Sequence, residues 1–113
     1  MLIKKKDSVL TVNSDYCKVN EFQFPYEKLG VAKVFINGRY PESGKGLNLE
    51  CDMSYYVTSG SGVIYYNGEK FEVSCGDVFY FEKNVPYFIF CNSLEIVLST
   101  SPAWRLEQYI IIE

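Results

Sequence analysis

The sequence predicts an all-β protein, an antiparallel sandwich or barrel with little helix. The clearest observation is the dipeptide Asn67-Gly68 between two runs rich in β-branched and aromatic residues, which is the pattern of a two-residue hairpin turn. Aromatic residues form 17% of the 113 residues, and nearly all are Tyr or Phe, which favour strands. No stretch repeats apolar residues at helical spacing, so helices are expected to be rare.

The hairpin also has a predicted register, because a two-residue loop fixes which residues face each other. The expected pairs are Tyr66 with Glu69, Tyr65 with Lys70, Ile64 with Phe71 and Val63 with Glu72. Side chains alternate between the two faces of a strand. We therefore expect Ile64, Phe71 and Val73 to share a face with Gly62 and Tyr66, and this apolar face to pack on the core.

The other elements follow from alternation and turn signals. Residues 1–19 are expected to hold one or two short strands around a turn at 13–15, and residues 20–30 to be irregular. Further strands are expected at 31–37, 47–53, 78–81, 87–91, 94–100 and 109–112. Between them we expect a polar loop at 39–46, a turn at 83–86, and a loop or single helical turn from 101 to 106. In the strand at 47–53, Leu47, Leu49, Cys51 and Met53 alternate onto one face. We expect one domain over residues 1–113, with N-terminal strands and an edge segment at 1–30, the barrel core at 47–100 and a tail at 101–113.

The charge and composition of the chain limit the classes of partner that it is expected to bind. The net charge is −3 and the isoelectric point is near 5.0, whereas a protein that grips a nucleic-acid backbone carries a basic face. The one basic run, at residues 4–6, is expected to be a solvated edge. The N-terminal stretch lacks the apolar segment of a secretory signal, and no apolar run reaches the ~20 residues of a membrane helix. We therefore expect a cytoplasmic protein with reduced cysteines and with neither nucleic-acid nor membrane partners.

The sequence contains no histidine. This excludes Ser-His-Asp and Cys-His catalysis, a histidine general base and histidine metal ligands. The four cysteines, at 17, 51, 75 and 91, form no C-x-x-C pair, so zinc-ribbon and thioredoxin-like sites are excluded as well.

Several motifs occur in an order that resembles the cupin superfamily. They are S-Y-Y-V-T-S-G-S-G-V at 54–63, N-G-E at 67–69, C-G-D-V-F-Y-F at 75–81, N-V-P-Y at 84–87 and S-T-S-P-A-W at 99–104. With the strand that precedes them they span Leu47 to Trp104, about half of the chain. The resemblance implies a small RmlC-like jelly-roll barrel, that is, a double-stranded β-helix.

The residues that hold a metal in many cupins are replaced here. The resemblance places the family's first two histidine positions at Leu47 and Leu49, or at Gly46 and Asn48. It places the third histidine position at Tyr87 and the glutamate position at Met53. Leucine and methionine side chains offer a hard metal ion no ligand, and one phenol cannot replace a complete set. The resemblance therefore implies the barrel without its metal, and no cofactor is expected.

The mouth of the expected barrel would form an apolar pocket with a few hydroxyls and thiols, which is typical of sites for small organic molecules. Its expected lining residues are Leu47, Leu49, Cys51, Met53, Tyr55, Tyr87 and Cys91. Tyr87 is the candidate catalytic residue, since its phenol could donate to a sugar hydroxyl or act as an acid. The alternative is that it fills the volume of the missing histidine and bonds a backbone carbonyl. Cys51 and Cys91 are either a soft-metal or redox pair or small buried hydrophobes.

Three other groups each have two interpretations. Glu50 and Asp52 are either an acid–base pair or part of a solvated face. The tyrosines at 55, 56, 65, 66 and 80 either stack on sugar rings or on a second subunit, or pack across strands. The cations Arg39, Lys45 and Arg105 either bind an anion, a phosphate or a carboxylate, at the barrel mouth or are solvated loop residues.

The sequence leaves three functions open. The first is a metal-independent, homodimeric cupin that binds a sugar-like or carboxylate-like small molecule, with the dimer covering open strand edges. The second is a metal-independent isomerase or epimerase of sugars or nucleotide sugars, in which Tyr87 with Glu50 or Glu82 would replace a histidine base. The third is a degenerate barrel with a structural or interaction role.

Overall fold

The structure, a computed structural model, describes the backbone of residues 1–113 and every side chain except that of residue 13. It contains the strands β1 (Val9–Ser14), β2 (Cys17–Phe22), β3 (Gly30–Tyr40), β4 (Lys45–Asn48), β5 (Asp52–Tyr66), β6 (Glu69–Ser74), β7 (Val78–Phe81), β8 (Tyr87–Ser101) and β9 (Tyr109–Ile112). Two single turns of 3-10 helix, η1 (Lys5–Asp7) and η2 (Leu106–Gln108), accompany them. The predicted all-β class with little helix is confirmed.

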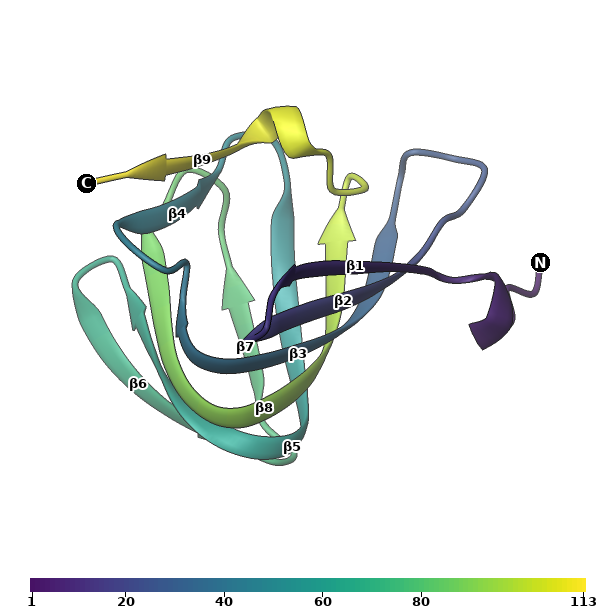
Figure 1. The fold of residues 1–113 in the computed structure, drawn as a ribbon. Helices are drawn as coiled ribbons and strands as arrows, with labels where there is room; N and C mark the ends of the chain where they lie inside the picture. The colour runs from purple at the N-terminus through teal and green to yellow at the C-terminus, as the bar shows by residue number, and fades with distance from the viewer.

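The strands form a curled antiparallel barrel (Figure 1). One path of neighbours runs β1-β2-β3-β8-β4-β9, and β5 joins it by pairing with β8 while also pairing with β6 and β7. The long strands β3, β5 and β8 bend because bulges interrupt their registers, between Ile36 and Gly38 and between Val57 and Ser61. Bent strands can contribute to both layers of the barrel, which is the jelly-roll arrangement that the resemblance implied.

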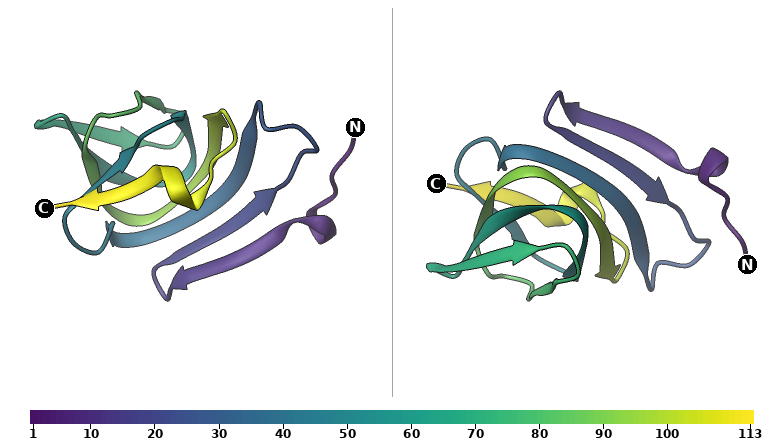
Figure 2. Two further views of the ribbon diagram at one scale, coloured as in Figure 1. Left: turned by 90° about the horizontal axis from the view of Figure 1, so that it is seen from above. Right: turned by 90° about the horizontal axis from the view of Figure 1, so that it is seen from below.

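The β1–β2 hairpin and the C-terminal segment occupy different sides of the barrel. Viewed from above and below, β1 and β2 continue the sheet outward from β3, whereas η2 and β9 cross one end of the barrel beside β4 (Figure 2). β4 pairs with β9 from Lys45↔Ile112 to Asn48↔Tyr109. The C-terminal strand thus closes the end of the barrel at which β4 and β5 meet.

The predicted hairpin of β5 and β6 has the expected register. All four predicted pairs are present, including Ile64 opposite Phe71. The turn residues Asn67 and Gly68 have φ of 51° and 79°, the left-handed conformation that a two-residue turn of type I′ needs. Ile64 and Val73 are buried, while Phe71 is 37% exposed at the edge of the same face.

The expected strand at 47–53 is divided. β4 ends at Asn48 and β5 begins at Asp52, because the intervening backbone N–H groups bond to Gln108 rather than to a neighbouring strand. The alternation therefore breaks, and Leu49 is 41% exposed while Cys51 is fully buried.

Two other expectations differ from the structure. The strands expected at 87–91 and 94–100 form one strand, β8, in which Ser93 has a positive φ of 47° at the bulge. β3 continues to Tyr40, into residues expected to be a loop. The first turn lies at residues 15 and 16, one to two positions later than expected, and the side chain of residue 13 lies outside the described set.

The core lies between the two layers of the barrel. Its fully buried side chains include Ile36, Val57, Ile64, Ile89 and Ile96, which strand alternation directs inward. Among the described residues, no helix is long and apolar enough to span a membrane.

Candidate ligand-binding site

A cavity of about 150 Å³ opens between the inner faces of β2 and β3 and the strands β5, β8 and β9. At about 30 Å³ per molecule it has the volume of about five waters, enough for one ring of an organic compound. Apolar side chains of β2, β3 and β8 form much of its wall. Its hydroxyl-bearing lining residues are Thr11, Tyr40, Tyr55, Tyr87, Thr100 and Tyr109.

Four of these hydroxyls belong to tyrosines on four different strands. Tyr40 ends β3, Tyr55 lies within β5, Tyr87 begins β8 and Tyr109 begins β9. Phe81 holds two of the rings, with its centroid 4.6 Å from that of Tyr55 and 4.9 Å from that of Tyr87. Tilted aromatic contacts of this kind fix ring positions in a core. The curl of the barrel thus brings residues far apart in sequence to one cavity.

The four phenols are neutral at physiological pH. Burial raises the pKa of Tyr55 and Tyr87 well above the usual value of 10.0, and neighbouring phenols raise it further. Burial also raises the pKa of Tyr40 and Tyr109 above that value. These groups can therefore donate and accept hydrogen bonds, but near neutral pH none of them is a phenolate base.

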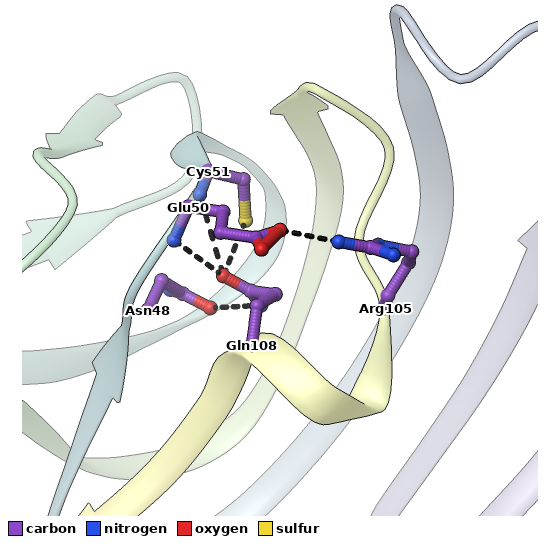
Figure 3. A network of polar contacts seen from close by, with 5 residues as sticks. All are labelled: Asn48, Glu50, Cys51, Arg105 and Gln108. Atoms are coloured by element: carbon purple, nitrogen blue, oxygen red, sulfur yellow. Dashed lines mark hydrogen bonds and ion pairs between the residues drawn. The ribbon is translucent and has the colours of Figure 1, made fainter.

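The position of Tyr109 depends on its neighbour Gln108, which is 2% exposed. The Gln108 Oε1 atom accepts bonds from the backbone N–H groups of Glu50 (3.2 Å) and Cys51 (3.3 Å) and from the Cys51 thiol (3.4 Å). Its Nε2 donates to Asn48 Oδ1 at 2.9 Å (Figure 3). This network ties η2 to the segment between β4 and β5, and so fixes where β9 and its first residue lie.

The structure separates the residues that the sequence predicted for the site. Met53, Tyr55 and Tyr87 line the cavity. Leu47, Leu49, Cys51 and Cys91 are not among its lining residues. Whether any of these seven side chains touches a ligand stays a prediction.

The two thiols predicted for the site have different surroundings. Cys51 bonds Gln108, whereas Cys91 donates to the carbonyl oxygens of Ile36 (3.3 Å) and Gly38 (3.5 Å). Burial raises the pKa of each thiol to about 11. Both are therefore protonated at neutral pH, which disfavours thiolate chemistry at either.

Sequence reasoning did not single out Tyr40, Thr100 or Tyr109 as lining residues. Tyr40 lies in a stretch that reads as a polar loop, and Tyr109 begins an apolar run that reads as an ordinary terminal strand. No local signal separates them from packing residues. Only the closure of the barrel brings them to the cavity.

Four of the charged residues weighed from the sequence, Arg39, Glu50, Asp52 and Arg105, bond to the protein itself. Glu50 pairs with Arg105 at the surface (Figure 3), and Asp52 accepts the backbone N–H of Lys83 at 2.8 Å. That bond, with one from the Tyr80 hydroxyl, lowers the pKa of Asp52. The Arg39 guanidinium donates to the carbonyl oxygens of residues 41 (2.6 Å) and 44 (2.9 Å).

The residues present do not fit the metal ion of metal-binding cupins. Of the positions aligned with the family's ligands, Met53 and Tyr87 line the cavity and Leu49 is exposed. Among the described residues, no three His, Cys, Asp or Glu side chains gather where they could hold a metal ion. A thioether and a phenol do not make a ligand set for a hard cation.

The arrangement of strands matches solved structures closely. The nucleoside dehydratase Pac13 superposes with a TM-score of 0.87 at 21% sequence identity, over 100% of this chain and 91% of its own. An RmlC-like cupin from Shewanella frigidimarina superposes with a TM-score of 0.73 at 17% identity, over 93% and 92% of the two chains. The chain has a cupin fold.

A third structure supports the same conclusion. KdgF from Halomonas sp. superposes on this cupin barrel with a TM-score of 0.76 at 16% identity, over 95% of this chain and 96% of its own. The resemblance drawn from the motifs is thereby confirmed at the level of the fold. No protein-family model matches the sequence, and no curated protein matches it either.

Proposed function

We propose that the protein is a small-molecule-binding cupin whose cavity takes a neutral, hydroxyl-bearing ring compound of the nucleoside class. The observation that carries this proposal is the convergence of four neutral tyrosine hydroxyls in an otherwise largely apolar cavity. Such hydroxyls can pair with the hydroxyl and carbonyl oxygens of a ligand, while the apolar wall covers its ring faces.

The charge of the cavity argues for a neutral ligand. Glu21 is the only charged residue among the described lining residues. A phosphate or carboxylate would lose its hydration on entry without gaining a cation in return, which is costly. Of the sugar-like and carboxylate-like ligands expected from the sequence, we therefore retain the neutral, sugar-like class.

The similar structures suggest a first probe. Pac13 is described as a nucleoside dehydratase, and Streptomyces PAC13 variants with one tyrosine or one histidine replaced are described with uridine. Uridine is a neutral compound with hydroxyls on its ribose and carbonyls on its pyrimidine, and the proposal is that the cavity of about 150 Å³ takes one of these two rings. The present chain contains no histidine, so a role filled by that side chain would need another group here.

We propose binding without chemical conversion. The phenols that line the cavity have raised pKa values and so cannot serve as bases near neutral pH. Glu50 and Glu82, the carboxylates that an isomerase or epimerase would need beside Tyr87, are not among the lining residues. No observation favours the isomerase over the binding protein.

Calorimetric titration with uridine tests this function. The wild-type protein should bind it saturably, and Tyr87→Phe and Tyr55→Phe should each weaken binding about fivefold to tenfold, since each removes one hydrogen bond. The matched control is Tyr56→Phe, because Tyr56 is 48% exposed and does not line the cavity. Uridine monophosphate should bind far more weakly.

Two results would contradict the proposal. One is the absence of saturable binding of uridine. The other is a Tyr87→Phe variant that binds uridine as the Tyr56→Phe control does. Mass spectrometry of uridine after long incubation with the protein should show it unchanged, and a new product would replace the binding role by a catalytic one.

The proposal includes a homodimer. β1 ends the strand path, and its exposed side chains include Val9 (46%), Leu10 (57%) and Val12 (54%). An apolar strand with an open edge is readily covered by a second copy. Sedimentation at micromolar concentration should give about 26 kDa, twice the 13.0 kDa of one chain; a 13.0 kDa species would rule the dimer out.

A further inference from the structure

One carboxylate lines the cavity without a partner in the protein. Glu21 lies on β2, is half-buried and is the only charged residue of the described lining. Among the described residues, no hydrogen bond or ion pair involves its side chain. This distinguishes it from Glu50, which pairs with Arg105. The Glu21 carboxylate is therefore an open hydrogen-bond acceptor that a ligand in the cavity can reach.

The register of the sheet directs Glu21 toward the interior. Glu21 lies opposite Ala32 on β3, and Ala32 lies opposite Leu98 on β8. Leu98 in turn lies opposite Tyr55 on β5. Residues directly opposite each other in a sheet project from the same face, and all four line the cavity. They form one row across four strands, with Glu21 at one end and Tyr55 at the other.

The two ends of this row have different surroundings. Tyr55 is 4% exposed, whereas Glu21 is only half-buried and Thr11, a lining residue of the neighbouring strand β1, is exposed. The mouth of the cavity therefore lies at the Glu21 end. Three strand intervals of about 4.8 Å make an arc of about 14 Å, which the curl of the barrel shortens (Figure 1). A ligand of two linked rings that places one ring at Tyr55 brings the other to Glu21.

Small residues keep the space beside Glu21 open. Ala32 lies opposite it, and Gly30 lies two residues before Ala32 on the same face of β3. The backbone of Trp104 packs so closely on Gly30 that a side chain there would contact it, and Trp104 itself lines the cavity. The Glu21 end thus combines an acceptor with an aromatic side chain. This combination suits a sugar, whose hydroxyls can pair with the carboxylate while its C–H groups cover an apolar wall.

We infer that Glu21 determines the ligand specificity of the cavity, by accepting hydrogen bonds from the two adjacent hydroxyls of a ribose. This inference rests on the proposed function and assigns one ring of the nucleoside to each end of the row, with the ribose at Glu21 and the pyrimidine at Tyr55. A carboxylate has two oxygens that only accept hydrogen bonds, which matches two neighbouring O–H donors. Acidic side chains bind ribose hydroxyls in dinucleotide-binding proteins by the same chemistry.

The pyrimidine fits the Glu21 end less well than the ribose does. Its N–H group lies between two carbonyl oxygens, which would face the carboxylate as acceptor against acceptor. The neutral phenols of Tyr55 and Tyr87, by contrast, can donate to those carbonyl oxygens. The order of the two rings in the cavity therefore follows from matching donors with acceptors.

Calorimetric titration of the wild-type protein and of Glu21→Gln, each with uridine and with deoxyuridine, tests this assignment. Deoxyuridine lacks one of the two adjacent ribose hydroxyls, so the wild-type protein should bind uridine about tenfold more tightly. Glu21→Gln keeps the shape of the side chain and turns one of its two acceptors into a donor. It should weaken uridine binding about tenfold and reduce the preference for uridine to less than about threefold.

The matched control is Glu72→Gln, because Glu72 is an exposed strand residue that does not line the cavity. This variant should keep both the affinity for uridine and the tenfold preference. Since no described protein group pairs with the Glu21 side chain, Glu21→Gln should melt within about 4 °C of the wild-type protein. A larger fall would mean that the carboxylate stabilises the fold, and would overturn its assignment as an open acceptor.

Failure of this inference differs from failure of the proposed function. If the wild-type protein binds uridine and deoxyuridine equally well, or Glu21→Gln keeps the tenfold preference, the role of Glu21 is overturned and the binding function stands. If the wild-type protein does not bind uridine, the proposed function fails, and the role of Glu21 fails with it.

Discussion

Replacement of Gln108 by methionine should destabilise the protein far more than a single side-chain change usually does. Methionine has nearly the same length and volume as glutamine but offers no comparable acceptor. The variant would leave the backbone N–H groups of Glu50 and Cys51 without the Oε1 atom that now accepts both. It would also break the bond from Nε2 to Asn48 Oδ1, which is 2.9 Å long.

The size of the effect follows from these contacts. A buried donor left unpaired costs about 1–3 kcal/mol, and loss of an ordinary hydrogen bond about 1 kcal/mol. With about 1 kcal/mol for the part-buried N–H of Glu50, about 2 kcal/mol for the buried N–H of Cys51 and about 1 kcal/mol for the amide bond, the free energy of unfolding falls by about 4 kcal/mol. Small domains have only about 5–15 kcal/mol in total, and a loss of this size lowers the melting temperature by about 16 °C.

Urea unfolding followed by tryptophan fluorescence measures this loss. The chain has one tryptophan, Trp104, and its ring lies 5.9 Å from that of Tyr109 beside the network. Gln23→Met is the matched control, because Gln23 is an exposed residue between β2 and β3 and its replacement should change the stability by less than about 0.5 kcal/mol. A loss below about 1 kcal/mol for Gln108→Met would refute the reasoning, since residues 50 and 51 would then have other acceptors.

Three further predictions concern the turn, the buried phenols and the surface ion pair. Gly68→Ala should cost about 1–2 kcal/mol in urea unfolding, because φ at Gly68 is 79° although no atom would contact the new methyl group; an unchanged midpoint would mean that the turn relaxes freely. Burial raises the pKa of Tyr87 in the folded state well above its usual value of 10.0, so the stability linked to this group is fully present below pH 10 and is lost as the pH rises further. The urea midpoint should therefore decrease as the pH rises above 10, and it should decrease less steeply in Tyr87→Phe than in Tyr56→Phe. Equal slopes in the two variants would contradict this prediction. Glu50→Gln should cost less than about 1 kcal/mol, since the Glu50 and Arg105 side chains are 49% and 50% exposed; a larger loss in the same assay would show that the pair is more than a surface contact.

The sequence alone determined the features that depend on near neighbours. The Asn67-Gly68 turn and its register follow from backbone preferences of adjacent residues, so all four predicted pairs are present. Strand alternation likewise placed Ile64 and Val73 in the core. The order of the motifs was enough to show a resemblance to the cupin superfamily, which similar solved structures confirm at the level of the fold.

The tertiary structure decided the features that depend on distant residues. Gln108 reaches across 57 residues to the N–H of Cys51, and this contact divides a strand that alternation predicts to be continuous. Bulges in β3, β5 and β8 shift which side chains face inward. The Gln108 contact also leaves Leu49 exposed, and the closing of the barrel brings Tyr40, Thr100 and Tyr109 to the cavity. A binding cavity is formed by side chains from several strands, and only the closing of the barrel brings those strands together.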